Sequence, residues 1–280
     1  MERRLQPALL NGGFSLRWRN MEYQNILFEV KDRIAFITVN RPKILNALND
    51  QTMEELRAAF LEIRRREDVG GVLFTGAGEK GFIAGADINE LATQTPLEGK
   101  DRSRRGHHIL DIIENLGKPV VAAINGYALG GGCEIAMACH IRTASENAKL
   151  GQPEVKLGIV AGYGGTQRLT RLVGLGRALE LLLTGEPISA QRAYEIGLVN
   201  AVFPQTELLA QSEILLRKIL ANGPLAVKLT MEAVLHGSQI SLAEGLNLEA
   251  DLFALSCTTE DMKEGTRAFV EKRAAKFVGK

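Results

Sequence analysis

The sequence predicts an α/β core that is followed by an α-helical C-terminal layer. Short apolar runs typical of strands alternate with segments of helical periodicity through the first two thirds of the chain. From residue 207 to about residue 273 the pattern is almost wholly helical. Strands that alternate with helices, followed by helices alone, indicate two parts of different structural class. We therefore expect the core at 21–206 and the helical region at 207–280.

The first 20 residues, MERRLQPALLNGGFSLRWRN, differ from the rest of the chain. They carry four arginines against one acidic residue, and Gly12 and Gly13 interrupt any amphipathic helix. We interpret residues 1–20 as a disordered or extraneous extension ahead of Met21, with a mitochondrial transit peptide as the alternative. We exclude residues 1–20 from the prediction of the fold.

The core begins with a predicted hairpin and a helix. Residues 26–31 and 34–39 are β-rich and are separated by a two-residue turn. Residues 51–66 place apolar side chains at helical spacing, and Thr52 and Glu55 match a capping box at the start of that helix.

The remaining elements continue this alternation. Strands are predicted at 71–75, 119–124, 141–144, 148–151 and 201–203, and helices at 102–116, after the glycine run 130–132, at 164–183 with a break at Gly174, and at 188–197 with Ser189 as N-cap. Units of two strands and a helix recur loosely at 26–66, 71–116 and 119–138.

Composition narrows the function classes. The net charge of +1 gives no global field that would attract nucleic acid or an anionic membrane. The three cysteines form neither a CxxC pair nor a cluster at zinc spacing, which suits a reducing compartment. No apolar run approaches the ~18 residues of a membrane-spanning helix. We therefore predict no metal site, no nucleic-acid partner and no membrane partner.

A G-x-G-x-x-G match at 76–81 invites a dinucleotide-binding interpretation. That fingerprint should open directly into a long helix, but here FIAGAD follows it. We interpret the segment as a turn with an exposed backbone, and a dinucleotide-dependent oxidoreductase remains the distant alternative.

Two other glycine-bearing loops are more informative as a pair. IAGAD at 83–87 and ALGGGCE at 128–134 can each lead into a helix N-terminus, where backbone N–H groups are free. Two such N–H groups that converge on one carbonyl oxygen form an oxyanion hole. The alternative is tight packing of both loops against the sheet.

Two glutamates are the candidate acid and base. Glu134 lies in the otherwise apolar run CEIAMAC, where an unpartnered carboxylate is costly, and Glu154 lies in the turn-like segment QPEV. Two carboxylates in one cleft could share acid and base roles. The four histidines are interpreted as structural: His107, His108, His140 and His236.

These stretches resemble the enoyl-CoA hydratase/isomerase (crotonase) family. The resemblance spans nearly everything from Met21 to the end and is carried by NRPKILNAL, GFIAGADINEL, KPVVAAINGYALGGGCEIAMACHIRTA, GQPEVKLGIVAGYGGTQRLTRLVG, TGEPISAQRAYEIGLVNAVFP and TTEDMKEGTRAFVEKRAAKF. It implies a crotonase-like spiral of β-β-α units with a C-terminal α-helical trimerisation region. It also implies a homotrimer or a dimer of trimers.

By motif position, the resemblance implies roles for individual residues. Glu134 and Glu154 would be the catalytic pair, and Ala86 and Gly131 would supply the two oxyanion-hole N–H groups. The positions that match substrate- or CoA-binding residues are Lys43, Ile44 and Leu45 at the adenine, Gly162 near the reacting carbons, Phe269 and Lys272 across a subunit boundary, and also Ala84, Asp87 and Ile88. Four positions depart from the family pattern, namely Ile44, Asn89, His140 and Ala161.

The expected activity is the reversible syn hydration of a 2-enoyl-CoA thioester to a 3-hydroxyacyl-CoA, with an acyl-CoA as the substrate partner. Coenzyme A is then part of the substrate, and no separate cofactor is expected. The alternatives are a 3,2-enoyl-CoA isomerase, another reaction through a thioester enolate, and a non-catalytic scaffold or RNA-binding member. The expected location is cytoplasmic, or the mitochondrial matrix if residues 1–20 are a transit peptide. Acyl specificity stays open, with the pocket floor expected at 87–105 and in part of the C-terminal helices.

Overall fold

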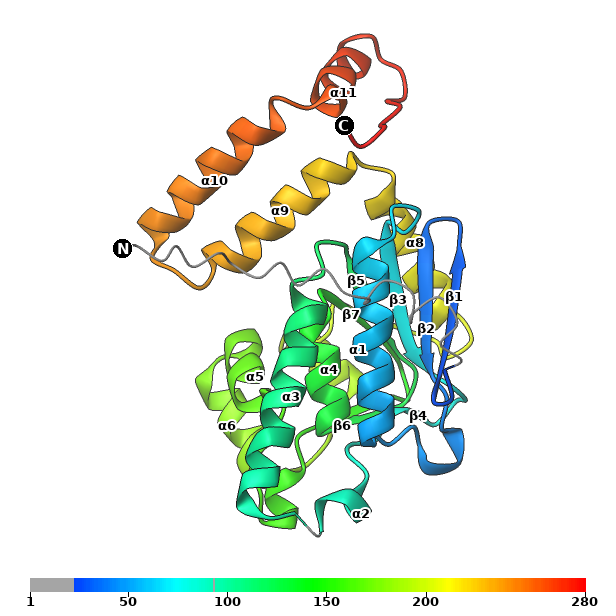
Figure 1. The fold of residues 1–280 in the computed structure, drawn as a ribbon, viewed down its shortest axis with the longest axis vertical. Coiled ribbons are helices and arrows are strands. Elements are labelled where there is room, and N and C mark those ends of the chain that lie inside the picture. Colours follow the sequence, from blue (N-terminus) through cyan, green and yellow to red (C-terminus); the bar gives the residue numbers. More distant parts are fainter. Residues whose placement is uncertain (1–22, 93) are drawn as a thin grey trace, which may run out of the picture.

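The computed structural model describes residues 23–92 and 94–280. The predicted extension at 1–20 lies outside the described residues. An α/β core carries α8 (Leu208–Leu220) on one side, and the last three helices, α9 (Pro224–Gly237), α10 (Leu242–Ser256) and α11 (Glu260–Val270), extend away from it (Figure 1).

The core contains two sheets. The six-stranded sheet has the order β1 (Ile26–Lys31), β2 (Ile34–Val39), β3 (Gly71–Gly76), β5 (Val120–Ile124), β7 (Ile141–Ser145) and β10 (Ala201–Phe203), and is parallel except for the pair β1–β2. The four-stranded sheet has the order β4 (Gly81–Ile83), β6 (Tyr127–Leu129), β8 (Lys149–Gly151) and β9 (Ile188–Ser189). The predicted hairpin is confirmed, and its turn places Asp32 and Arg33 at φ 49° and 67°, as a two-residue hairpin turn requires.

Helices follow the strand pairs and build a spiral. The bounds are α1 (Asp50–Arg65), α2 (Ile88–Leu91), α3 (Pro96–Glu114), α4 (Gly131–Ala138), α5 (Gly165–Val173), α6 (Leu175–Thr184) and α7 (Ala190–Glu195), with short 3-10 helices η1 (Pro42–Ile44) and η2 (Glu154–Leu157). From β3 to β8, the first strand of each pair joins the larger sheet and the second joins the smaller one. The predicted spiral of β-β-α units is therefore confirmed.

The strands of the larger sheet alternate between two apolar layers. Phe74 faces the main core beneath α1 and α3, whereas Leu73 packs with Leu208 and Leu216 of α8 on the opposite face. Successive side chains of a strand point to opposite faces, so a sheet covered on both sides needs nearly continuous apolar strands. The run PVVAAI predicted this burial, and β5 is buried throughout.

One predicted helix cap and one predicted helix start were wrong. Helix α1 is capped by Asn49, whose side chain accepts from the Thr52 N–H, and the predicted capping partner Glu55 instead accepts from the backbone N–H groups of Gln24 and Asn25 at 3.1 and 2.8 Å. Helix α3 begins at residue 96, six residues before the predicted 102, because Thr95 and Glu98 form a capping box there. The buried Glu55 therefore fixes the backbone segment that leads into β1.

The segment GAGEKG is the turn between β3 and β4. Gly76 ends β3 and Gly81 begins β4, and a Cβ on Gly76 would lie 2.2 Å from the Phe82 carbonyl oxygen. The interpretation as a turn is confirmed, since the segment leads into a strand and not into a helix. Within residues 23–92 and 94–280, no helix combines the length and apolar character needed to cross a bilayer.

Candidate active site

A cavity of about 660 Å³ lies where the loop after β4, the N-terminus of α4, the 3-10 helix η2 and the loop at 159–163 meet α3. Its lining includes both candidate glutamates, Glu134 and Glu154, and both candidate oxyanion-hole residues, Ala86 and Gly131. Residues that are far apart in the sequence are thus brought to one site.

Glu134 is held by backbone N–H groups. It lies in the first turn of α4 and is 1% exposed. Its Oε1 accepts from the N–H groups of Tyr163 and Gly165, both at 2.7 Å. Burial, with a smaller contribution from the charge of Glu154, raises the pKa of the Glu134 carboxyl to about 7, although the two N–H donors act in the opposite direction. Such a carboxyl can exchange a proton near neutral pH.

Glu154 begins η2 and lines the same cavity. Burial raises the pKa of its carboxyl. With its amide NH₂ turned toward Glu154, Gln152 lies within 3.0 and 3.1 Å of the two carboxylate oxygens. Gly130 permits the close approach, because a Cβ there would lie 2.7 Å from Glu154 Oε1. Two carboxyls with different surroundings therefore face one space.

The Ala86 and Gly131 N–H groups come from separate loops. Leu48 bonds to the residues on either side of Ala86: the Leu48 N–H donates to Gly85 O at 2.9 Å, and the Asp87 N–H donates to Leu48 O at 2.7 Å. Successive N–H groups of an extended segment point to opposite sides, so the Ala86 N–H faces away from Leu48. Within the part of the chain that the structure describes, neither the Ala86 nor the Gly131 N–H donates to a protein acceptor.

Gly132 allows these two loops to lie close together. A Cβ at this position would lie 2.0 Å from the carbonyl oxygen of Ile83, the last residue of β4. Only a glycine lets the start of α4 approach β4 this closely. The arrangement can bind a carbonyl oxygen at two N–H groups while two carboxyls handle protons beside it.

The other predicted binding residues divide into three groups. Ala84, Ile88 and Gly162 line the cavity. Lys43, Ile44 and Leu45 do not line it but lie next to it in and after η1, since the Ala84 N–H donates to Leu45 O at 3.0 Å, and Asp87 forms an ion pair with Arg41 at 3.5 Å. Phe269 and Lys272 lie at the end of α11, which stands apart from the core (Figure 1). The roles of all these residues stay predictions.

Sequence reasoning missed several residues of this site. The N–H groups of Tyr163 and Gly165 hold Glu134, and backbone donors leave no trace in side-chain patterns. Of the expected floor, 87–105 contributes Ile88 and the start of α3, whereas no residue of α8–α11 lines the cavity in this chain. The sequence pattern could not show that α3 turns its first residues toward the glutamates.

His140 has a structural role. Its Nδ1 accepts from the Val120 N–H at 2.9 Å, and its Nε2 lies 2.9 Å from Glu114 O. Burial lowers the pKa of this imidazole, which favours the neutral form. The prediction of a structural histidine is confirmed for His140.

Known proteins resemble this chain over most of its length. The family described as Enoyl-CoA hydratase/isomerase matches residues 29–280. A short-chain-enoyl-CoA hydratase of Clostridium acetobutylicum is 47% identical, with 90% of this chain and 97% of the relative covered. A crotonyl-CoA hydratase of Syntrophomonas wolfei is 45% identical, with 93% and 100% covered. The structure of an enoyl-CoA hydratase from Bacillus anthracis has a TM-score of 0.89 at 41% identity, with 92% and 100% covered.

Proposed function

This chain belongs to the enoyl-CoA hydratase/isomerase family, and from that premise we propose that it catalyses the reversible hydration of a short-chain 2-enoyl-CoA to the 3-hydroxyacyl-CoA. The observation that carries the proposal is the meeting of Glu134 and Glu154 in one cavity with two backbone N–H groups that have no acceptor among residues 23–92 and 94–280. A short acyl chain is supported by the relatives that are named short-chain-enoyl-CoA and crotonyl-CoA hydratases.

The proposed mechanism divides the work between the two glutamates. The thioester oxygen accepts from the N–H groups of Ala86 and Gly131, which stabilises the enolate charge. Glu134 takes a proton from the water that adds at C3, and Glu154 delivers a proton to C2. In dehydration the roles reverse. The pKa of Glu134, near 7, suits a group that gains and loses a proton in each cycle.

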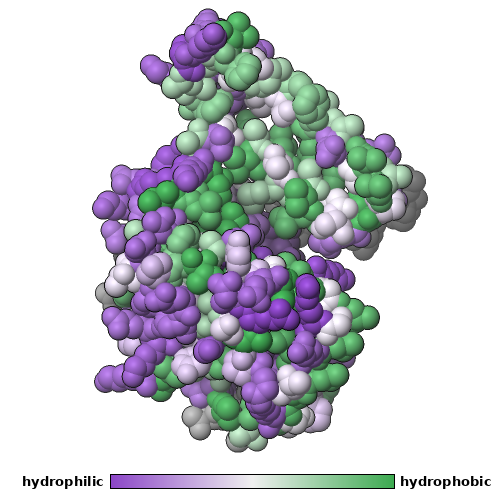
Figure 2. All heavy atoms as spheres, turned by 180° about the vertical axis from the view of Figure 1, so that it is seen from behind, coloured by the Kyte–Doolittle hydropathy of each residue, from purple (hydrophilic) through white to green (hydrophobic). Residues whose placement is uncertain are grey.

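The proposal includes an assembly of several copies of this chain through the C-terminal helices. Apolar side chains lie exposed over α9 and α10 (Figure 2). Among them are Val234, Leu242, Leu246, Phe253 and Leu255. Exposed apolar area of this kind marks a protein contact. We propose a homotrimer or a dimer of trimers, in which Phe269 and Lys272 reach the CoA of a neighbouring subunit and residues 43–45 hold the adenine.

A cytoplasmic location is also part of the proposal. It is supported by Cys133 and Cys139, which are buried as free thiols, as expected in a reducing compartment.

The direct test is an assay of the purified protein with crotonyl-CoA. We expect the absorbance of the conjugated enoyl thioester to fall, and 3-hydroxybutanoyl-CoA to be identified by chromatography with mass detection. The control is 3-enoyl-CoA: conversion of that substrate without hydration of crotonyl-CoA would favour the isomerase instead. Failure to hydrate any 2-enoyl-CoA of four to ten carbons by folded protein would overturn the proposal.

The activity should depend on pH through Glu134. Because the base must be ionised and the pKa of Glu134 is raised to about 7, kcat/KM for hydration should fall as pH drops below about 7, roughly tenfold per unit. Glu154, whose pKa is also raised by burial, must hold its proton to act as the acid. Because the two carboxyls interact, the limbs of the profile report the pair. Initial rates from pH 5 to 9 provide the measurement, and a flat profile from pH 5 to 8 would contradict Glu134 as the base.

A further inference from the structure

Tyr163 occupies a position that only a glycine on α3 permits. Its ring lies between Gly106 of α3 and Gly131 of α4. A Cβ on Gly106 would lie 2.1 Å from Tyr163 Cδ1, whereas a Cβ on Gly131 would lie 3.4 Å from Cδ2. The residue is 7% exposed. The ring is therefore fixed beside the oxyanion-hole glycine by the absence of a side chain at position 106.

Tyr163 also separates two spaces. It lines the catalytic cavity of about 660 Å³, and together with Arg102 it lines a second, much smaller crevice of about 10 Å³. Met53, Gly106 and Ile109 form part of the other wall of that crevice, where α1 meets α3. The two spaces share only Tyr163 and Arg102 among their described lining residues. Tyr163 and Arg102 are thus the wall between them.

Arg102 keeps its side of this wall polar. It is 7% exposed, and its Nη2 lies 2.8 Å from Asp50 Oδ1 and 2.7 Å from Glu90 Oε2. Its Nε is buried without a hydrogen-bond partner among the described residues. The carbon atoms of a long acyl chain would not be stabilised next to these charges. They would separate the guanidinium of Arg102 from its carboxylate partners and would offer Nε no acceptor.

The wall is tied to α3 on both sides of the ring. Ser103 Oγ donates to Gly162 O at 2.6 Å, and Arg168 donates from Nη1 to Tyr163 O at 3.1 Å while it pairs with Glu114 at 2.7 Å. Helix α3 thereby holds the backbone before and after the ring. A wall fixed in this way cannot yield to a longer substrate without moving the N–H groups that bind Glu134.

We propose that Tyr163, seated on Gly106 and backed by Arg102, closes the acyl end of the cavity and restricts the enzyme to short 2-enoyl thioesters. The inference rests on the proposed hydratase function and adds the residue that sets acyl length. A chain of about four carbons ends before the ring, whereas a longer one meets it. Removal of the ring joins the cavity to the crevice between α1 and α3.

The test compares Tyr163→Ala with wild-type protein on crotonyl-CoA and trans-2-decenoyl-CoA. The readout is the ratio of kcat/KM for decenoyl-CoA to that for crotonyl-CoA, because any disturbance of Glu134 by the substitution affects both substrates and cancels. One methylene that newly enters an apolar site tightens binding roughly fourfold, so two give about fifteenfold. We expect the ratio to rise at least tenfold in Tyr163→Ala and to stay within threefold in Tyr163→Phe, which keeps the ring.

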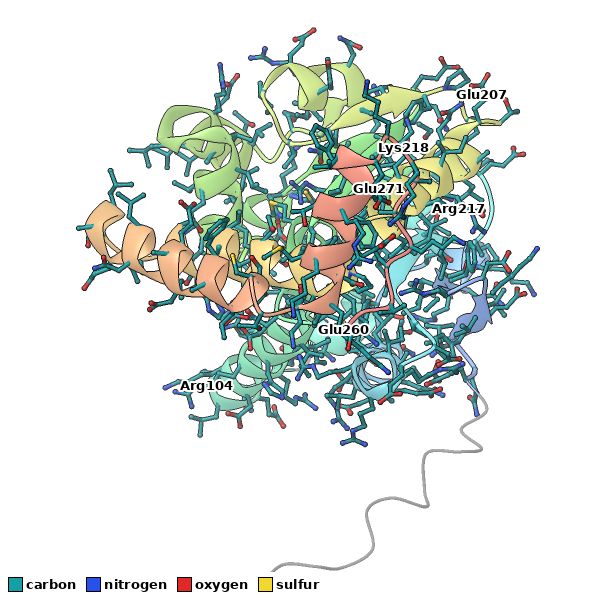
Figure 3. The ribbon with its side chains drawn as sticks, turned by 90° about the horizontal axis from the view of Figure 1, so that it is seen from above. Arg104, Glu207, Arg217, Lys218, Glu260 and Glu271 are labelled. Carbon is teal, nitrogen blue, oxygen red and sulfur yellow. The ribbon has the colours of Figure 1, made fainter. Side chains whose placement is uncertain are left out.

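The matched surface control is Arg104→Ala, on the same helix as Arg102 but with a side chain that points outward (Figure 3). An unchanged ratio in folded Tyr163→Ala overturns the proposal, and so does a wild-type protein that hydrates both substrates equally well. If Tyr163→Ala does not fold, Tyr163→Leu takes its place, with a rise of at least threefold expected.

A second measurement tests the role of Tyr163 without catalysis: the affinities of butanoyl-CoA and decanoyl-CoA are determined by calorimetry. The affinity ratio of decanoyl-CoA to butanoyl-CoA should rise in the alanine variant even if no hydration is detected. A wild-type protein that binds these ligands with the expected preference but hydrates nothing would overturn the hydratase function and leave the wall intact. An affinity ratio that does not change in the variant would overturn the wall.

Discussion

Replacement of Glu134 by glutamine should lower kcat for crotonyl-CoA hydration by about 10²–10⁴-fold, and replacement of Glu154 by glutamine should cause a loss of similar size, as removal of a general acid or base does. Glutamine is nearly the size of glutamate and keeps an oxygen that can accept from the N–H groups of Tyr163 and Gly165. The loss would therefore reflect proton transfer and not collapse of the site. Steady-state kinetics of both variants provide the measurement.

Glu146→Gln is the matched control, because Glu146 lies exposed in the turn after β7 and outside the cavity. It should keep the wild-type kcat within a factor of two. If either Glu134→Gln or Glu154→Gln retains kcat within tenfold of the wild type, the division of work between two carboxylates is wrong.

The Glu134→Gln variant should at the same time be more stable than the wild type at pH 8. The folded-state pKa of Glu134, about 7, lies above its ordinary value of 4.5. The wild-type fold is therefore favoured below pH ~4.5 and loses up to roughly 3 kcal/mol as pH rises through 7. Glutamine carries no charge and avoids this loss. Urea unfolding at pH 5 and 8 should show the advantage of the variant growing with pH.

The second large effect is expected at Gly132. In Gly132→Ala the new Cβ would meet the Ile83 carbonyl oxygen at 2.0 Å, so the start of α4 must move away from β4. This movement separates the N–H groups of Ala86 and Gly131. Loss of one oxyanion-hole donor typically lowers kcat by about 10²–10³-fold, and we expect a decrease of that order. Overpacking of this kind should also lower the free energy of unfolding by about 1–3 kcal/mol.

Gly176→Ala is the control for a glycine-to-alanine change inside a helix. Gly176 lies in α6, and a Cβ there would meet no atom within 4 Å. Alanine is the better helix former by about 1 kcal/mol, so this variant should be as stable as the wild type or slightly more so, with unchanged kcat. If Gly132→Ala behaves like Gly176→Ala in both measurements, the close approach of the two loops is not needed for activity.

Local patterns in the sequence were sufficient for much of the fold. The unbroken apolar run of β5 predicted a strand that is buried on both faces, and β5 is buried throughout, because this signal depends only on neighbouring residues in the chain. The glycine run before Glu134 predicted a buried helix start, and α4 is buried throughout. The predicted cap of α1 was wrong because Glu55 bonds to the distant N–H groups of Gln24 and Asn25. The predicted start of α3 was wrong because the capping box of Thr95 and Glu98 was not recognised.

The sequence by itself singled out Glu134, since this residue stands in an apolar helix and a charge there needs a partner. Glu154 was singled out by the resemblance of its QPEV segment to the family. Only the tertiary structure decided what the partners of Glu134 are. The N–H groups that hold Glu134 come from residues 29 and 31 positions away, and the ring of Tyr163 is fixed by a glycine on another helix. Backbone donors and missing side chains carry no periodic signal. Their effect arises only when the spiral brings separate loops to within a few ångströms of one another.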